Sequence, residues 1–131
     1  MFGELTILVR ATAETTNGAF TLFEEVPPLA DTPLHFHQNE DEWFYVLEGE
    51  HVFQVGEQEF PARPGGLVFA PRGIPHAQRR VVPTVGRLLI LTAPAGLEGF
   101  FRVLAAAHEA GTLGPDAYAK ASEEYGITWI G

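Results

Sequence analysis

The sequence predicts an all-β protein of one domain, a sandwich or barrel followed by two short helices. Between residues 5 and 93, short apolar, β-branched or aromatic runs alternate with turn residues at nearly even spacing. The chain contains 14 Gly and 10 Pro, residues that end strands and form turns. Its 131 residues are enough for one hydrophobic core and too few for two.

The runs that we expect to form strands follow one another along the chain as LTILV, AFTLFEEV, WFYVL, HVFQV, QEFPA, GLVFAP and RLLILTA. After residue 95 the apolar residues change to helical spacing, which predicts a helical segment over about residues 96–126. A first helix ends at Gly111, and a second runs from Pro115 to Tyr125 with Gly126 just past its end. We expect both helices to pack on the outside of the barrel. The apolar tail 127–130 predicts a short strand or docking segment.

Composition excludes several classes of function. There is no Cys, so a metal ion must be held by His and carboxylate side chains. A net charge of −9 disfavours nucleic acid as a partner. No apolar run approaches the roughly 20 residues of a membrane helix, and the first ten residues lack the layout of a signal peptide. We therefore expect a cytoplasmic protein that binds neither nucleic acid nor a membrane.

Four side chains have the types and positions of a metal site. His35 and His37 lie two residues apart on an expected strand, so both rings point to one face. Glu42 begins the next strand, and His76 begins a later one after a Pro-x-Gly turn that ends at Gly73. Three imidazoles and one carboxylate leave one or two positions open on a five- or six-coordinate ion, as in a catalytic site.

These residues resemble the paired motifs of the cupins. The first motif corresponds to His35-x-His37, Glu42 after four further residues and Gly49 after six more. The second corresponds to the following positions: Gly65, Pro71, Gly73 and His76. Two positions depart from the pattern: the Gly before the first His is absent near residues 29–31, and Arg80 replaces the closing Asn. Neither position is a metal ligand in the family.

The resemblance implies a single cupin domain over residues 1–131, a double-stranded β-helix or jelly-roll barrel spanning about residues 5–93. It implies one divalent transition metal ion, Mn, Fe, Ni, Co, Cu or Zn, held by four ligands: His35, His37, Glu42 and His76. The likeness is greatest to quercetin 2,3-dioxygenase-like proteins, in which the substrate gives its proton to the carboxylate ligand and reacts with dioxygen. Glu42 would then be both ligand and catalytic base.

Three functions remain open at this stage. The first is a dioxygenase acting on a small aromatic or enolisable compound. The second is a non-redox metalloenzyme, such as an isomerase, lyase or hydrolase, and the third is a module that binds a metal or small ligand without turnover. Exposed strand edges and a tail containing Trp129 also predict a homodimer.

Other residues have less specific interpretations. Five residues on expected strands either line a hydrophobic substrate pocket or belong to the core: Phe44, Val46, Phe53, Val55 and Phe69. We interpret His51 as a partly exposed strand residue and His108 as a core or interface residue of the first C-terminal helix. Glu40 and Asp41 are expected to be surface carboxylates of the turn before Glu42.

Overall fold

The computed structural model describes residues 6–26, 31–81 and 86–130. Its elements are β1 (Thr6–Ala11), α1 (Ala13–Thr16), β2 (Thr21–Val26), β3 (Thr32–His37), β4 (Asp41–Glu48), β5 (His51–Val55), β6 (Gln58–Ala62), β7 (Leu67–Ala70), β8 (His76–Arg80), β9 (Arg87–Ala93), α2 (Glu98–Glu109), α3 (Pro115–Tyr125) and β10 (Ile127–Trp129). The expected all-β fold with two C-terminal helices is confirmed. The barrel boundary at residue 5 lies outside the described residues. The one-turn helix α1 was not expected, and the Thr12 N–H donates to Thr15 Oγ1 at its start.

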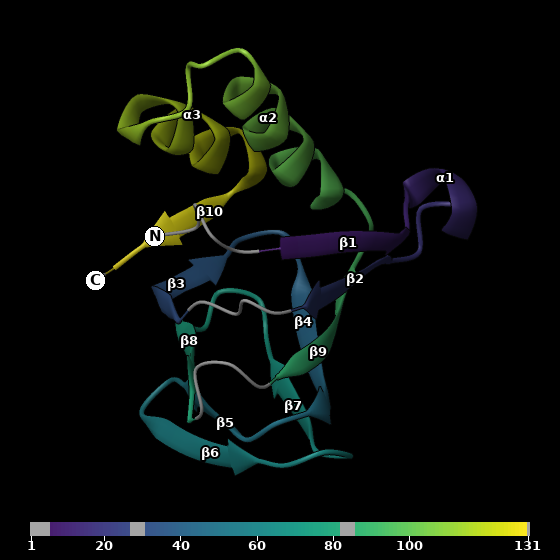
Figure 1. Cartoon of the computed structure of the whole chain (residues 1–131), viewed down its shortest axis with the longest axis vertical. Coiled ribbons are helices and arrows are strands. Elements are labelled where there is room, and N and C mark those ends of the chain that lie inside the picture. The colour runs from purple at the N-terminus through teal and green to yellow at the C-terminus, as the bar shows by residue number, and fades with distance from the viewer. Residues whose placement is uncertain (1–5, 27–30, 82–85, 131) are drawn as a thin grey trace.

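Two five-stranded antiparallel sheets face each other and form the barrel (Figure 1). The strand orders are β1-β2-β9-β4-β7 and β10-β3-β8-β5-β6. Side chains alternate between the buried and the more exposed face along β2, β4 and β9, as the period of two in a half-buried strand requires. The inner faces supply most of the core, which includes Phe23, Phe44, Val46, Phe53, Val68, Leu88 and Ile90. Each such side chain stabilises the fold by about 1.5–3 kcal/mol through burial.

Pairing between strands brings the two parts of the predicted site together. Within one sheet, Glu42 on β4 lies opposite Thr92 on β9. Within the other, His35 on β3 lies opposite His76 on β8. Because β3 and β4 belong to different sheets, the short turn 38–40 carries the chain from one inner face to the other. His37 and Glu42 therefore approach each other from facing sheets.

The C-terminal helices lie together at one end of the barrel, next to β1 and β10 (Figure 1). Pro115 begins α3, and Gly126 ends it in the left-handed conformation with φ 72°, as the sequence predicts. The tail forms β10, which pairs with β3 along its last three residues. Helix α2 covers this end of the barrel from the outside, and Leu97, Phe100 and Phe101 line the cavity beneath it.

The start of α2 is fixed by a buried carboxylate. Glu98 is only 3% exposed, and its Oε1 accepts hydrogen bonds from Thr21 Oγ1 at 2.5 Å and from the Gly96 N–H at 2.9 Å. Its Oε2 accepts a third from the Ala13 N–H at 2.8 Å. Glu98 thus joins α2 to both β2 and α1, and the helix is held over the end of the barrel.

Candidate metal centre

His35 and His37 project from the same face of β3 into the barrel. They are 7% and 5% exposed, whereas Phe36 between them faces the other way and is half-buried. The Nδ1 atom of His35 lies 2.7 Å from the Pro33 carbonyl oxygen. Since a carbonyl only accepts, Nδ1 carries the proton and the Nε2 lone pair is available to a metal ion.

The turn before His76 is docked onto the segment that carries the other ligands. The Gly73 N–H donates to the His37 carbonyl oxygen at 2.8 Å, and Gly73 has a φ of 77°, which favours glycine. Asp41 Oδ1 accepts from the Arg72 N–H at 2.9 Å. Asp41 is therefore half-buried and joins the two motifs, where an exposed surface carboxylate was expected.

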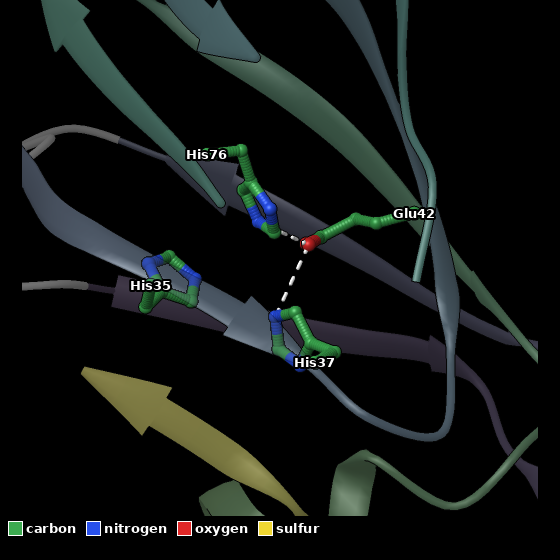
Figure 2. Close-up of side chains that lie close together, drawn as sticks. All are labelled: His35, His37, Glu42 and His76. Atoms are coloured by element: carbon green, nitrogen blue, oxygen red, sulfur yellow. Dashed lines mark ion pairs between the residues drawn. The ribbon is translucent and has the colours of Figure 1, made fainter. Parts of the chain in front are cut away.

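The four predicted ligands converge at one point (Figure 2). One ligand atom from each of His35, His37, Glu42 and His76, together the His/Glu cluster, lies within 4.8 Å of every other. Glu42 Oε1 is 2.9 Å from His76 Nε2 and 3.2 Å from His37 Nε2. All four side chains are buried.

The cluster leaves polar atoms unsatisfied. Glu42 Oε1 and His76 Nε2 are buried and have no hydrogen-bond partner. Each buried, unsatisfied polar group costs about 1–3 kcal/mol, and more when it is charged. A divalent cation between three imidazole nitrogens and a carboxylate would remove that cost, so the residues fit a transition metal ion.

Electrostatics in the cluster favour the metal-binding protonation states. Burial and the neighbouring His76 ring lower the pKa of His35 to about 4, so His35 is neutral at pH 7. Burial by itself would raise the pKa of Glu42, but the His37 and His76 rings lower it below its usual range and the carboxylate is ionised. Burial opposes a charge on His37, yet the Glu42 carboxylate outweighs burial and raises the pKa of His37. A metal ion must therefore displace a proton from His37 more often than from His35.

Glu40 belongs to the site, and the sequence interpretation missed it. Its side chain is only 6% exposed, where a surface carboxylate was expected. Glu40 Oε1 lies 3.7 Å from His37 Nδ1, on the side of the ring away from Glu42, and neither atom has a hydrogen-bond partner. A carboxylate behind a ligating imidazole is a common means of fixing the ring orientation. Its position three residues after His37 was the only available signal.

A cavity that is partly open to solvent adjoins the cluster. Phe44 lines it, as one of our two interpretations expected, while Val46 and Phe53 are buried in the core and Val55 packs against that core. Phe69 does not fit a pocket role: it is 44% exposed on the outer face of β7 and packs on Trp43 at 4.8 Å between ring centroids.

Residues near the C-terminus complete the cavity in place of Phe69. Phe100 and Phe101 of α2 line it, and the Trp129 ring of β10 lies 4.7 Å from the His35 ring. The Trp129 Nε1–H donates to Ser122 Oγ at 2.9 Å, which fixes the indole over the His35 ring. The contribution of the tail to the site could not be read from the sequence.

The other two histidines lie outside the candidate metal centre. His51 is 2% exposed, and its Nε2 lies 3.1 Å from the Glu48 carbonyl oxygen, so it is buried on β5 and not partly exposed. His108 lies on the exposed side of α2 and is not a core residue. Neither lines the cavity next to the His/Glu cluster.

Comparison with known proteins agrees with the geometry. The sequence profile of the cupin domain matches residues 22–91, more than half of the chain. The chain belongs to the cupin family. The matched residues of this cupin include all four members of the His/Glu cluster.

Several relatives of this cupin have known names or structures. A quercetin 2,3-dioxygenase of Bacillus subtilis is 28% identical over 100 residues, which cover 76% of this chain and 29% of the relative. A 3-hydroxyanthranilate 3,4-dioxygenase of Xanthomonas campestris is 32% identical over 66 residues, covering 47% of this chain and 37% of the relative. The crystal structure of TT1209 from Thermus thermophilus is 31% identical with a TM-score of 0.58, over 70% of this chain and 84% of that one. The chain thus spans about a third of the length of the two dioxygenases.

None of the helices in residues 6–26, 31–81 and 86–130 has the length and apolar character needed to cross a membrane.

Proposed function

We propose that this cupin is a metal-dependent dioxygenase that acts on a small aromatic or enolisable compound. The observation that carries the proposal is the convergence of four buried side chains with metal-ligating atoms beside an apolar cavity. Two of these atoms, Glu42 Oε1 and His76 Nε2, have no hydrogen-bond partner. The relatives named quercetin 2,3-dioxygenase and 3-hydroxyanthranilate 3,4-dioxygenase support this reaction class. The bound transition metal would supply a site where dioxygen and an oxygen atom of the substrate meet.

The residues of the chain have separate roles in this proposal. His35, His37, Glu42 and His76 would hold the ion, and Glu42 would also take the proton of the substrate hydroxyl onto its carboxylate oxygen. Glu42 is ionised, and its side chain lines the cavity, so the carboxylate lies where a substrate hydroxyl would approach the ion. Phe44, Phe100 and Phe101 would enclose the ring of the substrate and exclude water.

The test combines metal analysis with oxygen uptake. Protein purified without chelators from cells grown with transition metals should contain about one equivalent of metal. The loaded protein should consume oxygen with at least one compound from a panel of flavonols, catechols and β-diketones. No bound metal would overturn the proposal. Bound metal with turnover that persists under strict anaerobiosis would indicate a non-redox metalloenzyme, and saturable binding of an unchanged ligand would indicate a binding module.

We also propose that the protein is a homodimer, and that the outer face of the first sheet forms the interface. A groove on this face is lined only by apolar or aromatic side chains: Leu22, Trp43, Tyr45, Leu67, Leu89 and Leu91. Leu67 is 63% and Tyr45 40% exposed in the single chain. Contiguous exposed apolar surface of this kind usually marks a protein contact. Trp129, in contrast, packs on His35 and gives no support to the dimer.

Ultracentrifugation of the wild type and two variants tests the interface. We expect a dimer for the wild type and a monomer for Leu67→Arg, because a charge would be buried at the contact. Val103→Arg is the matched control, since Val103 is an exposed apolar residue of α2, outside the groove. A wild-type monomer, or a Leu67→Arg dimer, would contradict this assignment.

A further inference from the structure

The cavity contains a second polar group apart from the His/Glu cluster. Glu25 on β2 is 1% exposed and Gln78 on β8 is 7% exposed, and both line the cavity. Gln78 Nε2 donates to both carboxylate oxygens of Glu25, at 3.0 and 3.1 Å. Gln78 Oε1 is buried and accepts no hydrogen bond. We refer to Glu25 and Gln78 as the Glu25/Gln78 pair.

The pair has a defined position relative to the cluster. Gln78 follows His76 by two residues on β8, so both side chains point to the inner face. Their Cα atoms are about 7 Å apart, given a strand rise of roughly 3.3 Å per residue. Thr32 fixes this part of β8, because its Oγ1 accepts a hydrogen bond from the Gln78 N–H at 3.0 Å.

The cavity wall near both polar groups is apolar and aromatic. Phe23, Phe44 and Ile90 come from the first sheet, and Phe100 and Phe101 from α2. An apolar cavity with a few polar groups is the usual form of a small-molecule site, in which the polar groups determine orientation. The metal end alone would allow a ring to rotate about its coordinated oxygen, so a second polar contact would select one orientation.

The chemistry of the pair defines the group that it can receive. Gln78 Oε1 only accepts hydrogen bonds. A hydroxyl or amino group of a ligand would satisfy Gln78 Oε1, whereas a methyl group would leave it unpaired at a cost of about 1–3 kcal/mol. A carboxylate substituent of a ligand would place a second hydrogen-bond acceptor against Gln78 Oε1.

We propose that the Glu25/Gln78 pair is a specificity subsite that binds a hydroxyl or amino substituent of a small aromatic ligand whose opposite edge binds the metal. This inference rests on the proposed function for the metal end only. The preferred substrates would then be aromatic rings that carry a metal-binding oxygen on one edge and a hydrogen-bond donor on the opposite edge. The pair is not required for metal binding itself.

Calorimetric titration under argon tests the subsite without turnover. The probes are 4-(hydroxymethyl)catechol and 4-methylcatechol, which differ by one hydroxyl group, added to protein loaded with Ni²⁺. We expect the wild type to bind the hydroxymethyl compound roughly tenfold more tightly, the value of one well-placed hydrogen bond. Gln78→Met should abolish this preference and leave the affinity for 4-methylcatechol within about twofold of the wild type.

The matched control is Gln54→Met, because Gln54 on β5 has the same side chain, does not line the cavity and donates to the Gly56 carbonyl oxygen. It should keep the wild-type preference. If Gln78→Met fails to fold, Glu25→Gln supplies a second variant of nearly unchanged shape, and it should weaken the preference.

Each outcome separates this inference from the proposed function. Equal affinities for the two catechols in the wild type would overturn the subsite while the metal site stands. Persistence of the preference in Gln78→Met would also overturn it. Failure of the protein to take up metal would instead overturn the proposed function, and failure of both catechols to bind the loaded protein would overturn both.

Discussion

The buried carboxylates of Glu42 and Glu98 have opposite surroundings. Glu98 accepts hydrogen bonds from the Thr21 hydroxyl and from two backbone N–H groups. Glu42 is 7% exposed, and its Oε1 lies against two imidazole nitrogens without accepting any hydrogen bond. Both groups are ionised, since the pKa of each is lowered. Only one of them is satisfied by the protein itself.

This difference distinguishes a structural carboxylate from a ligand. A charge buried with its full set of donors stabilises the elements that provide the donors, here α1, α2 and β2. The Glu42 charge is balanced in the empty protein by the His37 and His76 rings, and a bound cation would take over that role. We therefore expect substitution of Glu42 to lower metal affinity, and substitution of Glu98 to lower stability without a change in metal affinity.

The largest effect is expected for Glu42→Gln. It should lower metal affinity by at least about 100-fold, because even the outer partners of metal ligands contribute 10- to 100-fold. The metal-free variant should be less stable than the metal-free wild type, since the buried His37 and His76 rings lose the carboxylate that pairs with them. Competition with a chromogenic chelator measures the affinity and urea denaturation the stability.

Glu48→Gln is the matched control for Glu42→Gln, because Glu48 is an exposed carboxylate of the same strand, β4. Glu48→Gln should change neither the metal affinity nor the stability. Unaltered metal affinity in Glu42→Gln would contradict the assignment of this ligand.

The two carboxylates were not equally accessible to sequence analysis. The His/Glu cluster could be predicted because its members belong to short strands and to a motif of fixed spacing. Two of the three bonds to Glu98 come from residues 77 and 85 positions away, and nothing near Glu98 in the chain indicates these two. Contacts of α2 and β10 with the cavity were missed for the same reason.

Strand orientation set a second limit on prediction. Every residue of the short strand β7 (LVFA) is apolar, so the sequence does not show which face is inward. A shift of one residue exchanges the two faces, and this is why Phe69 was assigned to the pocket although Val68 and Ala70 face the core. In β4, by contrast, the position of Glu42 fixed the inward set and correctly gave Phe44 and Val46.

A smaller effect on metal affinity is expected for Glu40→Gln. We expect a 10- to 100-fold loss, the usual cost of removing the outer partner of a ligating His. Chemical shifts of the His37 ring nitrogens should show a larger fraction of the tautomer protonated at Nε2, which a general structural role of Glu40 would not produce. Glu57→Gln, a change of an exposed carboxylate between β5 and β6, should leave the metal affinity and the ring-nitrogen chemical shifts unchanged.

Substitution of the structural carboxylate Glu98 should lower stability and leave metal affinity unchanged. Glu98→Gln places an amide NH₂ group among three donors and should lower the free energy of unfolding by about 2 kcal/mol. Metal affinity should stay within about twofold of the wild type, because Glu98 is not a ligand. Glu109→Gln, at the exposed end of the same helix, is the control and should be neutral. A Glu98→Gln variant that loses metal with unchanged stability would reverse our distinction.

The smallest expected effect is the pH dependence of that stability difference. Burial by itself raises the pKa of Glu98, but hydrogen bonds from Thr21 and from backbone N–H groups outweigh burial and lower the pKa below its ordinary value of 4.5. The unfolded chain therefore binds the proton first as the pH falls, so the stabilisation is complete above pH 4.5 and is lost as the pH falls through the lower, folded-state pKa. The stability difference between the wild type and Glu98→Gln should be constant near pH 7 and should shrink below pH 4.5. Urea denaturation of both proteins from pH 7 to pH 3 measures it, and subtraction removes the other acidic groups. A difference that stayed constant over the whole range would show that the Glu98 carboxylate is not held ionised by its donors.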